Sequence, residues 1–138
     1  MVKAPKLYFY DTGLACYLLR ITDSQTLLTH PARGAIFENF IINELIKNRF
    51  NAGKRSNLYF WRDRSGHEID ALIDEGTELI PIEVKSGQTI TADYFKGLKF
   101  WGKLTGKSNG LIFYGGDSSQ KRSDGIEVKS WREVKNFA

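Results

Sequence analysis

Two carboxylates and a lysine lie in two neighbouring runs of alternating residues. In residues 69–74 apolar side chains alternate with a set that includes Asp70, and in residues 80–85 they alternate with a set that includes Glu83 and Lys85. An alternation with a period of two indicates a β-strand. The segment between the runs contains a glycine and suits a hairpin loop. The stretch therefore predicts a β-hairpin that carries acidic and basic side chains.

The three side chains are expected on one face of this hairpin. If Asp74 pairs with Leu79, Asp70 falls opposite Glu83, and directly opposed residues point to the same face. Lys85 follows Glu83 by two positions and shares that face. Opposed like charges repel each other, and a divalent cation bound to carboxylate oxygens would relieve the repulsion. A solvated hairpin face, on which Lys85 pairs with one of the acids, explains the pattern equally well.

A helical pattern in residues 32–48 contains a further acid. At about 100° per residue, Asn39, Asn43 and Lys47 form one polar stripe, and apolar side chains cover most of the remainder. Glu38 falls inside the apolar arc, where a carboxylate is costly unless it is paired or binds a metal ion. The helix dipole also favours an acid near the start of a helix. Glu38 is therefore either a site residue or a charge that the dipole stabilises.

Length and composition describe one globular domain. The chain has 138 residues, of which 41% are hydrophobic and 13% aromatic, enough for a real core. It contains no apolar run of membrane-spanning length and no signal peptide at its N-terminus. Cys16 is the single cysteine, so we expect a cytoplasmic protein without internal disulfides or membrane contact. The net charge of +4 is compatible with nucleic-acid binding and does not establish it.

The remaining pattern predicts an α/β (α+β) fold. The expected order of helix, three strands, helix, two strands and helix indicates a mixed central sheet flanked by helices. Before the helix of residues 32–48, the sequence predicts a short helix that follows a strand or extended segment. In chain order, these further elements are expected at residues 7–10, 14–19, 58–62, 94–104, 110–114, 126–129 and 131–137.

The motifs of the hairpin resemble those of the PD-(D/E)XK nuclease superfamily. The chain has Gly-x-Glu-Ile-Asp ending at Asp70 and Ile-Glu-Val-Lys ending at Lys85, with isoleucine in place of the family's proline before the aspartate. The resemblance implies a restriction-endonuclease-like sheet and a site for Mg²⁺ or Mn²⁺. Asp70, Glu83, the Val84 carbonyl and Glu38 would bind the metal ion. Asp70, Glu83, Lys85 and Glu38 would be the catalytic residues, with Lys85 as the catalytic lysine.

Three further motifs extend the resemblance over most of the chain. They are Tyr-Phe-Tyr-Asp-Thr-Gly-Leu-Ala from Tyr8, Arg-Gly-Ala-Ile-Phe-Glu-Asn-Phe from Arg33, and Phe-Trp-Arg-Asp from Phe60. In this order they resemble the C-terminal domain of unknown function that follows the AAA+ core of many bacterial and archaeal ATPases. The resemblance implies that residues 1–30 are a helical remnant of a linker from such an ATPase domain. Residues 31–138 would then be the nuclease-like domain, and the AAA+ domain its partner.

The function implied by this resemblance is metal-dependent hydrolysis of phosphodiester bonds in nucleic acid, with DNA favoured over RNA. Arg62, Lys96 and Lys99 are weaker candidates for phosphate contacts, and a plain surface charge explains each of them better. The alternative is a catalytically inactive nuclease fold that binds nucleic acid or protein within the ATPase.

The five-residue motif Ile-Glu-Val-Lys-Ser occurs twice, at residues 82–86 and 126–130. The first copy has a hairpin partner strand that carries Asp70. The second copy follows a long polar loop and has no strand-borne acid nearby. We therefore expect Lys85 to be the functional lysine, and Lys129 to be an ordinary strand residue.

Overall fold

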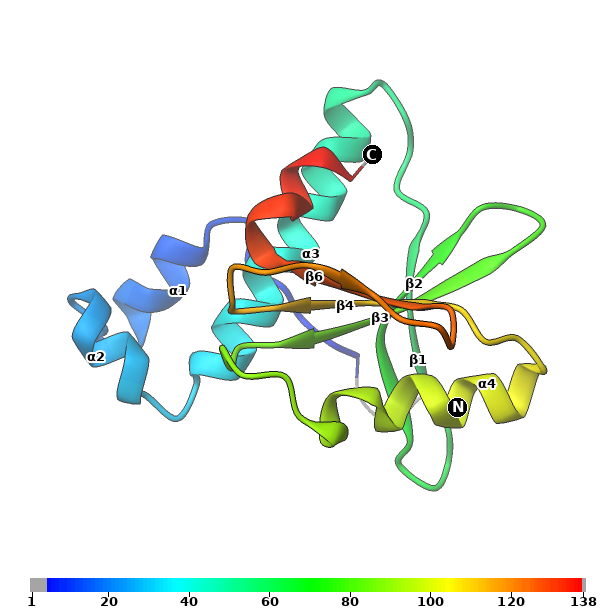
Figure 1. Ribbon diagram of the computed structural model, residues 1–138. Helices are drawn as coiled ribbons and strands as arrows, with labels where there is room; N and C mark the ends of the chain where they lie inside the picture. The colour runs from blue at the N-terminus through cyan, green and yellow to red at the C-terminus, as the bar shows by residue number, and fades with distance from the viewer. Residues whose placement is uncertain (1–4, 138) are drawn as a thin grey trace.

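The computed structural model describes residues 5–137, and a six-stranded mixed sheet runs through its centre with helices on both faces (Figure 1). The strand order is β1-β2-β3-β4-β6-β5. Neighbours β1, β2 and β3 are antiparallel, β3, β4 and β6 are parallel, and β5 pairs antiparallel with β6. This confirms the predicted mixed sheet. The strands are β1 (Leu58–Arg62), β2 (Glu68–Asp74), β3 (Leu79–Lys85), β4 (Gly110–Tyr114), β5 (Gln120–Lys121) and β6 (Ile126–Ser130).

The helices of residues 33–51 and 96–105 cover the two faces of the sheet, and two short helices pack against the first of them. Six helical elements are present in residues 5–137: α1 (Thr12–Leu18), α2 (Ser24–Thr29), α3 (Arg33–Asn51), α4 (Lys96–Thr105) and the 3₁₀ helices η1 (Ala92–Phe95) and η2 (Trp131–Asn136). The expected helices are confirmed, although the last one is a 3₁₀ helix. Helix α2 lies in the connector of residues 22–33, for which the sequence allows a helical turn, and the short edge strand β5 was not predicted. Asp11 and Asp23 cap α1 and α2 by accepting hydrogen bonds from backbone N–H groups, as N-cap residues do.

Two apolar cores lie on opposite faces of the sheet. On one face Ile82 and Val84 of β3 pack under α3, together with Ile41 and Leu45. On the other face α4 covers a second core. That core includes Leu72, Leu98, Trp101, Ile112 and Val128. Each strand buries alternate side chains against different helices, which explains why the central strands are apolar at nearly every position.

Strand β2 contains a bulge opposite β1. Tyr59 pairs with Leu72, but Trp61 pairs with Ile69. Between these two pairs β2 therefore holds one residue more than β1, which is the definition of a β-bulge.

The bulge changes the direction of the side chains at the start of β2. Residues two apart in a regular strand face the same side, yet Ile69 belongs to the core under α4 and Ala71 to the core under α3. Asp70 lies between them. The bulge thus places this acid at the change of face.

The chain before α1 is extended and packs on α3, and it forms no strand. Asn39 accepts a hydrogen bond from the Phe9 N–H at 2.6 Å and donates one to the Phe9 carbonyl at 2.9 Å. Asn43 donates to the same carbonyl. Asn39 and Asn43, assigned by the sequence to a polar stripe with Lys47, are buried, because this segment covers them. Lys47 is exposed.

Within residues 5–137, every helix is too short or too polar to cross a membrane. Residues 5–30 are helical where the sequence predicted helix, and their origin as a linker stays a prediction.

Candidate functional site

The ladder between β2 and β3 ends before the candidate acids. The pair next to the loop, Asp74–Leu79, is present as predicted, and the ladder continues as far as Ala71. Asp70 and Glu83 would form the next pair, but the strands separate there. The expected direct opposition of these two residues is therefore wrong, because the bulge in β2 moves Asp70 out of the ladder.

Asp70 instead bridges the gap between the separating strands. Its Oδ2 accepts a hydrogen bond of 2.8 Å from the backbone N–H of Val84 in β3. Its Oδ1 lies 3.4 Å from the ammonium of Lys6. The residue is only 8% exposed. One carboxylate oxygen of Asp70 thus takes the place of a backbone hydrogen bond between β2 and β3, and the other oxygen remains available to a cation.

Glu83 and Lys85 are neighbours on β3 and form an ion pair of 2.6 Å. Glu83 is 4% exposed and lies against α4. At Gly97 of that helix, a Cβ atom would collide with the Glu83 carboxylate. Gly97 therefore permits the close approach of the helix to the acid. The sequence analysis missed this residue, whose signal is a glycine inside an amphipathic helix.

Glu38 reaches the same region from the first turns of α3. Its Oε1 accepts hydrogen bonds from the Tyr8 hydroxyl at 2.7 Å and from the Lys6 ammonium at 2.9 Å. Glu38 is therefore neither a free surface charge nor held by the helix dipole alone.

Lys6 is the cation at the centre of this group of acids. Besides its contacts with Glu38 and Asp70, its Nζ lies 3.8 Å from Glu68 and 5.0 Å from the centre of the Phe60 ring. The sequence analysis missed Lys6, because it assigned this part of the chain to a linker.

An open cavity of about 360 Å³ lies over these residues. Glu38, Asp70, Val84 and Lys85 line it, together with Gly34, Ser86, Gly87 and Tyr94. The structure thus brings four of the predicted site residues to one cavity. Glu83 does not line the cavity but pairs with Lys85, which does, and the roles of all five residues stay predictions.

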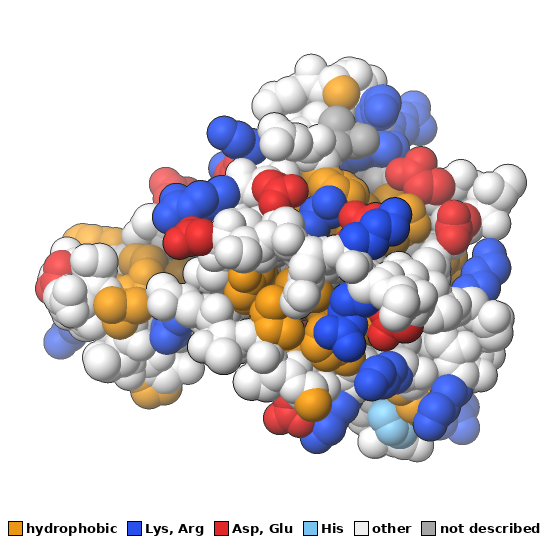
Figure 2. Space-filling view, in the orientation of Figure 1, with side chains coloured by type: hydrophobic (Ala, Val, Ile, Leu, Met, Phe, Trp, Pro, Cys, Tyr) orange, Lys and Arg blue, Asp and Glu red, His pale blue; other side chains and the backbone are white. Residues whose placement is uncertain are grey.

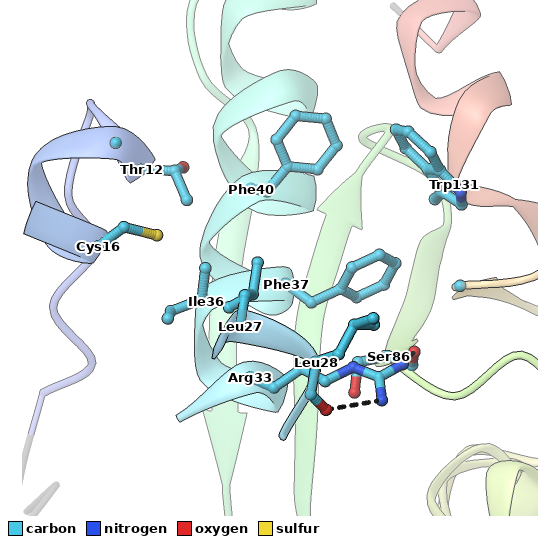
Figure 3. Close-up of a pocket in the computed structure, with 12 residues that line it drawn as sticks. Thr12, Cys16, Leu27, Leu28, Arg33, Ile36, Phe37, Phe40, Ser86 and Trp131 are labelled. Carbon is cyan, nitrogen blue, oxygen red and sulfur yellow. Dashed lines mark hydrogen bonds between the residues drawn. The ribbon is translucent and has the colours of Figure 1, made fainter. Parts of the chain in front are cut away.

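A second cavity of about 350 Å³ adjoins the first and shares Ser86 with it. Figure 3 shows Phe37, Phe40 and Trp131 around it. Arg33 lies at its border and donates a 2.7 Å hydrogen bond to the Ser86 carbonyl. None of the described residues that line this cavity carries a carboxylate, so the candidate metal site belongs to the first cavity.

Burial and mutual repulsion weaken the acidity of the carboxyls. Burial raises the pKa of Asp70, and the charge of Glu38 adds to this, against the opposing effect of the Val84 N–H and of Lys85 and Lys6. Burial and the charge of Asp70 raise the pKa of Glu83 to about 7, although Lys85 opposes the rise. The site therefore holds negative charge at a cost that a cation would reduce.

The two lysines remain charged. Burial lowers the pKa of Lys85, but the charge of Glu83 and its hydrogen bond outweigh burial, so the pKa is raised. Burial likewise lowers the pKa of Lys6, and the hydrogen bond to Glu38 with the charge of Asp70 outweighs it. Both ammonium groups therefore persist at neutral pH.

The donor atoms suit a hard divalent cation, but their present arrangement does not chelate one. Carboxylate and carbonyl oxygens are the ligands that Mg²⁺ prefers, and these buried acids already hold a cation, the Lys6 ammonium. Across residues 5–137, no three His, Cys, Asp or Glu side chains gather closely enough to hold a metal ion. Binding of a metal ion would therefore require these side chains to move.

The candidates for phosphate contacts lie in separate surroundings. Arg62 donates to Glu68 at 2.9 Å, and Lys96 pairs with Asp93 at the start of α4. Lys99 is exposed on the same helix. Figure 2 shows several Lys and Arg side chains over the region of α4, so this side of the molecule offers positive charge.

The second copy of the five-residue motif forms β6, where its surroundings differ. Lys129 pairs with Glu127 at 3.0 Å. In the parallel ladder these two residues lie beside Phe113 and Leu111 of β4. On its other side β6 pairs with β5, whose two residues carry no carboxylate, so no strand-borne acid takes the place that Asp70 has beside the first copy.

Comparison with known proteins identifies relatives but no activity. A family model described as a domain of unknown function, DUF4143, matches residues 33–134. An uncharacterized protein of Mycobacterium bovis and one of Mycobacterium tuberculosis are each 31% identical to this chain over 87 residues. The matched part is 63% of this chain and 19% of each relative, so the chain spans about a fifth of their length. No solved structure matches the chain significantly.

Proposed function

The chain belongs to the DUF4143 family of domains of unknown function, and we propose that it hydrolyses phosphodiester bonds in nucleic acid with Mg²⁺ or Mn²⁺ as cofactor, with DNA as the preferred substrate. The observation that carries this proposal is the meeting of Glu38, Asp70 and Lys85 in one cavity where β2 and β3 separate. Such chemistry needs anionic oxygen ligands for a metal ion and a cation beside the reacting phosphate. The cavity offers both.

The roles in this proposal are those that the resemblance to the nuclease superfamily implies. Asp70, Glu83 and the carbonyl of Val84 bind the metal ion in this proposal, with Glu38 as a further ligand. A metal ion held there would polarise the phosphate and activate a water molecule. Lys85 keeps its proton, because its pKa is raised. It places a fixed positive charge where negative charge develops on the phosphate.

The substrate backbone would approach along α4. In this proposal Lys96 and Lys99, with Arg62 of β1, contact phosphates next to the scissile bond. Such contacts position a nucleic acid without reading its sequence. They therefore fit a domain whose binding weakens as salt increases.

The direct test is cleavage of labelled single-stranded and double-stranded DNA and RNA. The wild-type domain should cut in Mn²⁺ or Mg²⁺ and not in EDTA, and Asp70→Asn should not cut. Asp117→Asn is the control, since Asp117 pairs with Arg132 at the surface. If the wild type cuts none of these substrates with either metal ion, the proposal is rejected.

The alternative proposal is a nuclease-like fold that binds nucleic acid or protein without catalysis. One observation favours it: the ammonium of Lys6 already pairs with both Glu38 and Asp70, so the fold holds these acids together without a metal ion. Gel-shift and cleavage assays on the same substrates separate the two proposals, because a binding module would bind in EDTA and would not cut when Mn²⁺ or Mg²⁺ is added.

We also propose an AAA+ ATPase domain of the same polypeptide as the partner. The relatives are about five times longer than the matched part, which leaves room for one. Apolar side chains are exposed on α1 and α2, among them Tyr17, Leu18 and Leu28. A second domain could cover such a patch.

A further inference from the structure

We propose that the Lys6 ammonium is a built-in counter-ion that competes with a divalent cation for Glu38 and Asp70, so that the N-terminal segment controls metal loading of the site. This inference rests on the metal site of the proposed function. It adds a mechanism that regulates metal binding, which is not part of the proposed function.

The Lys6 ammonium lies between the two acids that would share a metal ion. Lys6 Nζ lies 2.9 Å from Glu38 and 3.4 Å from Asp70, and its side chain is 19% exposed. These two acids come from α3 and β2 and are distant in sequence. A single cation that contacts both occupies the place where a shared metal ion would bind.

Simultaneous occupation is unfavourable for geometric and electrostatic reasons. Mg²⁺ binds carboxylate oxygens at about 2.0–2.1 Å, so an ion shared by Glu38 and Asp70 would lie within a few ångströms of the present ammonium. The two cations would repel each other strongly in this partly buried site. Metal binding therefore requires that Lys6 leaves its acids.

The segment is built so that Lys6 can leave while the rest stays in place. Phe9 is fixed by the buried amides of Asn39 and Asn43, and these bonds do not involve Lys6. Leu7, the residue between Lys6 and Tyr8, is 82% exposed and contributes little packing. Rotation of the lysine side chain, or a movement of residues 5–7, would free the acids without loss of the anchor at Phe9.

The exchange has a functional consequence. At low divalent-cation concentration the lysine holds the acids, and the domain stays inactive. At higher concentration the metal ion replaces it by mass action. Lys6 thus sets the metal concentration at which the site becomes loaded.

The experiment measures Mn²⁺ affinity by isothermal titration calorimetry on four proteins: the wild type, Lys6→Gln, Lys6→Arg and Lys47→Gln. Lys6→Gln should bind Mn²⁺ about tenfold more tightly or better, because one competing charge is gone. Lys6→Arg keeps the charge and should not gain affinity. Lys47→Gln is the matched control, since Lys47 pairs with Glu44 on the exposed side of α3. Addition of Asp70→Asn to Lys6→Gln should remove the gain.

A second measurement uses the wild type alone and does not depend on the folding of any variant. Acylation of lysine amines, read by peptide mass spectrometry, should modify Lys6 faster when Mn²⁺ is added, because the ammonium is released from its acids. Lys47 should react at the same rate with and without Mn²⁺.

The outcomes separate this inference from the proposed function. Equal Mn²⁺ affinity in the wild type and Lys6→Gln, or a Lys6 reactivity that Mn²⁺ does not change, overturns the inference and leaves the nuclease proposal standing. A gain in affinity without any cleavage supports the inference and rejects the nuclease activity. Absence of Mn²⁺ binding in all four proteins overturns both.

Discussion

The carboxylate of Asp70 accepts a 2.8 Å hydrogen bond from the backbone N–H of Val84, at the point where β2 and β3 separate. The bond fixes one oxygen of the acid to the neighbouring strand. The other oxygen faces Lys6 and the cavity. Asp70 thus links the two strands where they separate and also offers a carboxylate oxygen to a cation. It is therefore the first position to test.

Divalent cations should stabilise the domain through Asp70. Mn²⁺ or Mg²⁺ binds the folded state and relieves the repulsion of the buried acids, so the melting temperature should rise by a few degrees at saturating metal. Asp70→Asn should abolish the rise, and Asp117→Asn should preserve it. Melting curves with metal and with EDTA check this. An equal rise in the wild type and in Asp70→Asn would place the bound metal ion elsewhere.

The two copies of Ile-Glu-Val-Lys-Ser should differ in function. Lys85→Ala should reduce metal-dependent cleavage by about 100-fold, the size of effect seen when one charge-stabilising group is lost. Lys129→Ala should leave cleavage nearly unchanged, because Lys129 pairs only with Glu127 and Glu133 and no acid of a neighbouring strand lies beside it. Initial rates on one substrate measure the difference, and melting curves verify that both variants fold. A loss in Lys129→Ala alone would assign the chemistry to β6.

The metal-free fold should lose stability as the pH rises, through Glu83. The pKa of this carboxyl is raised from 4.5 to about 7. A group whose pKa is higher in the folded chain contributes stability that is complete below the unfolded value and is lost as the pH passes the folded value. Glu83→Gln mimics the protonated form. It should therefore raise the free energy of unfolding at pH 8, by on the order of 2 kcal/mol, and much less at pH 5.

Urea unfolding in EDTA at pH 5 to 8 provides the measurement. Glu127→Gln is the matched control, because Glu127 holds the same place in the second copy and its pKa is lowered by hydrogen bonds from Lys129 and Lys121. That variant should gain nothing at pH 8. A gain of equal size in both variants would show that burial of Glu83 is not the cause.

Gly97 should resist substitution although it lies in a helix. Alanine in place of glycine usually stabilises a helix by about 0.5–1 kcal/mol. At Gly97 a Cβ would collide with the Glu83 carboxylate, so Gly97→Ala should destabilise the domain by about 1–3 kcal/mol. Gly34→Ala in α3, where the nearest side-chain atom is 4.0 Å from the Cβ position, should not. Denaturant unfolding compares the two, and equal effects would contradict the close contact.

The local sequence pattern correctly predicted the two strands that carry the site, and it predicted how their residues pair next to the connecting loop. The predicted runs agree with β2 and β3 to within one residue, and the Asp74–Leu79 pair is correct, because alternation and a short loop are local properties. The bulge was not predictable from the hairpin alone. It arises where β2 must pair with β1 on one side and β3 on the other.

The contacts of Lys6, Asn39 and Asn43 could not be predicted, because they join segments that are distant in the sequence. Lys6 reaches Glu38 over 32 positions and Asp70 over 64, and no local pattern reports such distances. Helical periodicity correctly put Asn39 and Asn43 on one stripe. It cannot say whether water or another segment covers that stripe, since both satisfy amide side chains equally.

The separation between Lys6 and Asp70 also bears on the order in which the domain folds. A hairpin such as β2–β3 closes a short loop within microseconds, whereas contacts over 64 positions cost more loop-closure entropy and form later. Asp70 and Glu83 would therefore meet on the hairpin, together with Lys85, before Lys6 arrives. Refolding should then accelerate when salt or Mn²⁺ screens the early repulsion, which gives this charged site a part in the kinetics of folding.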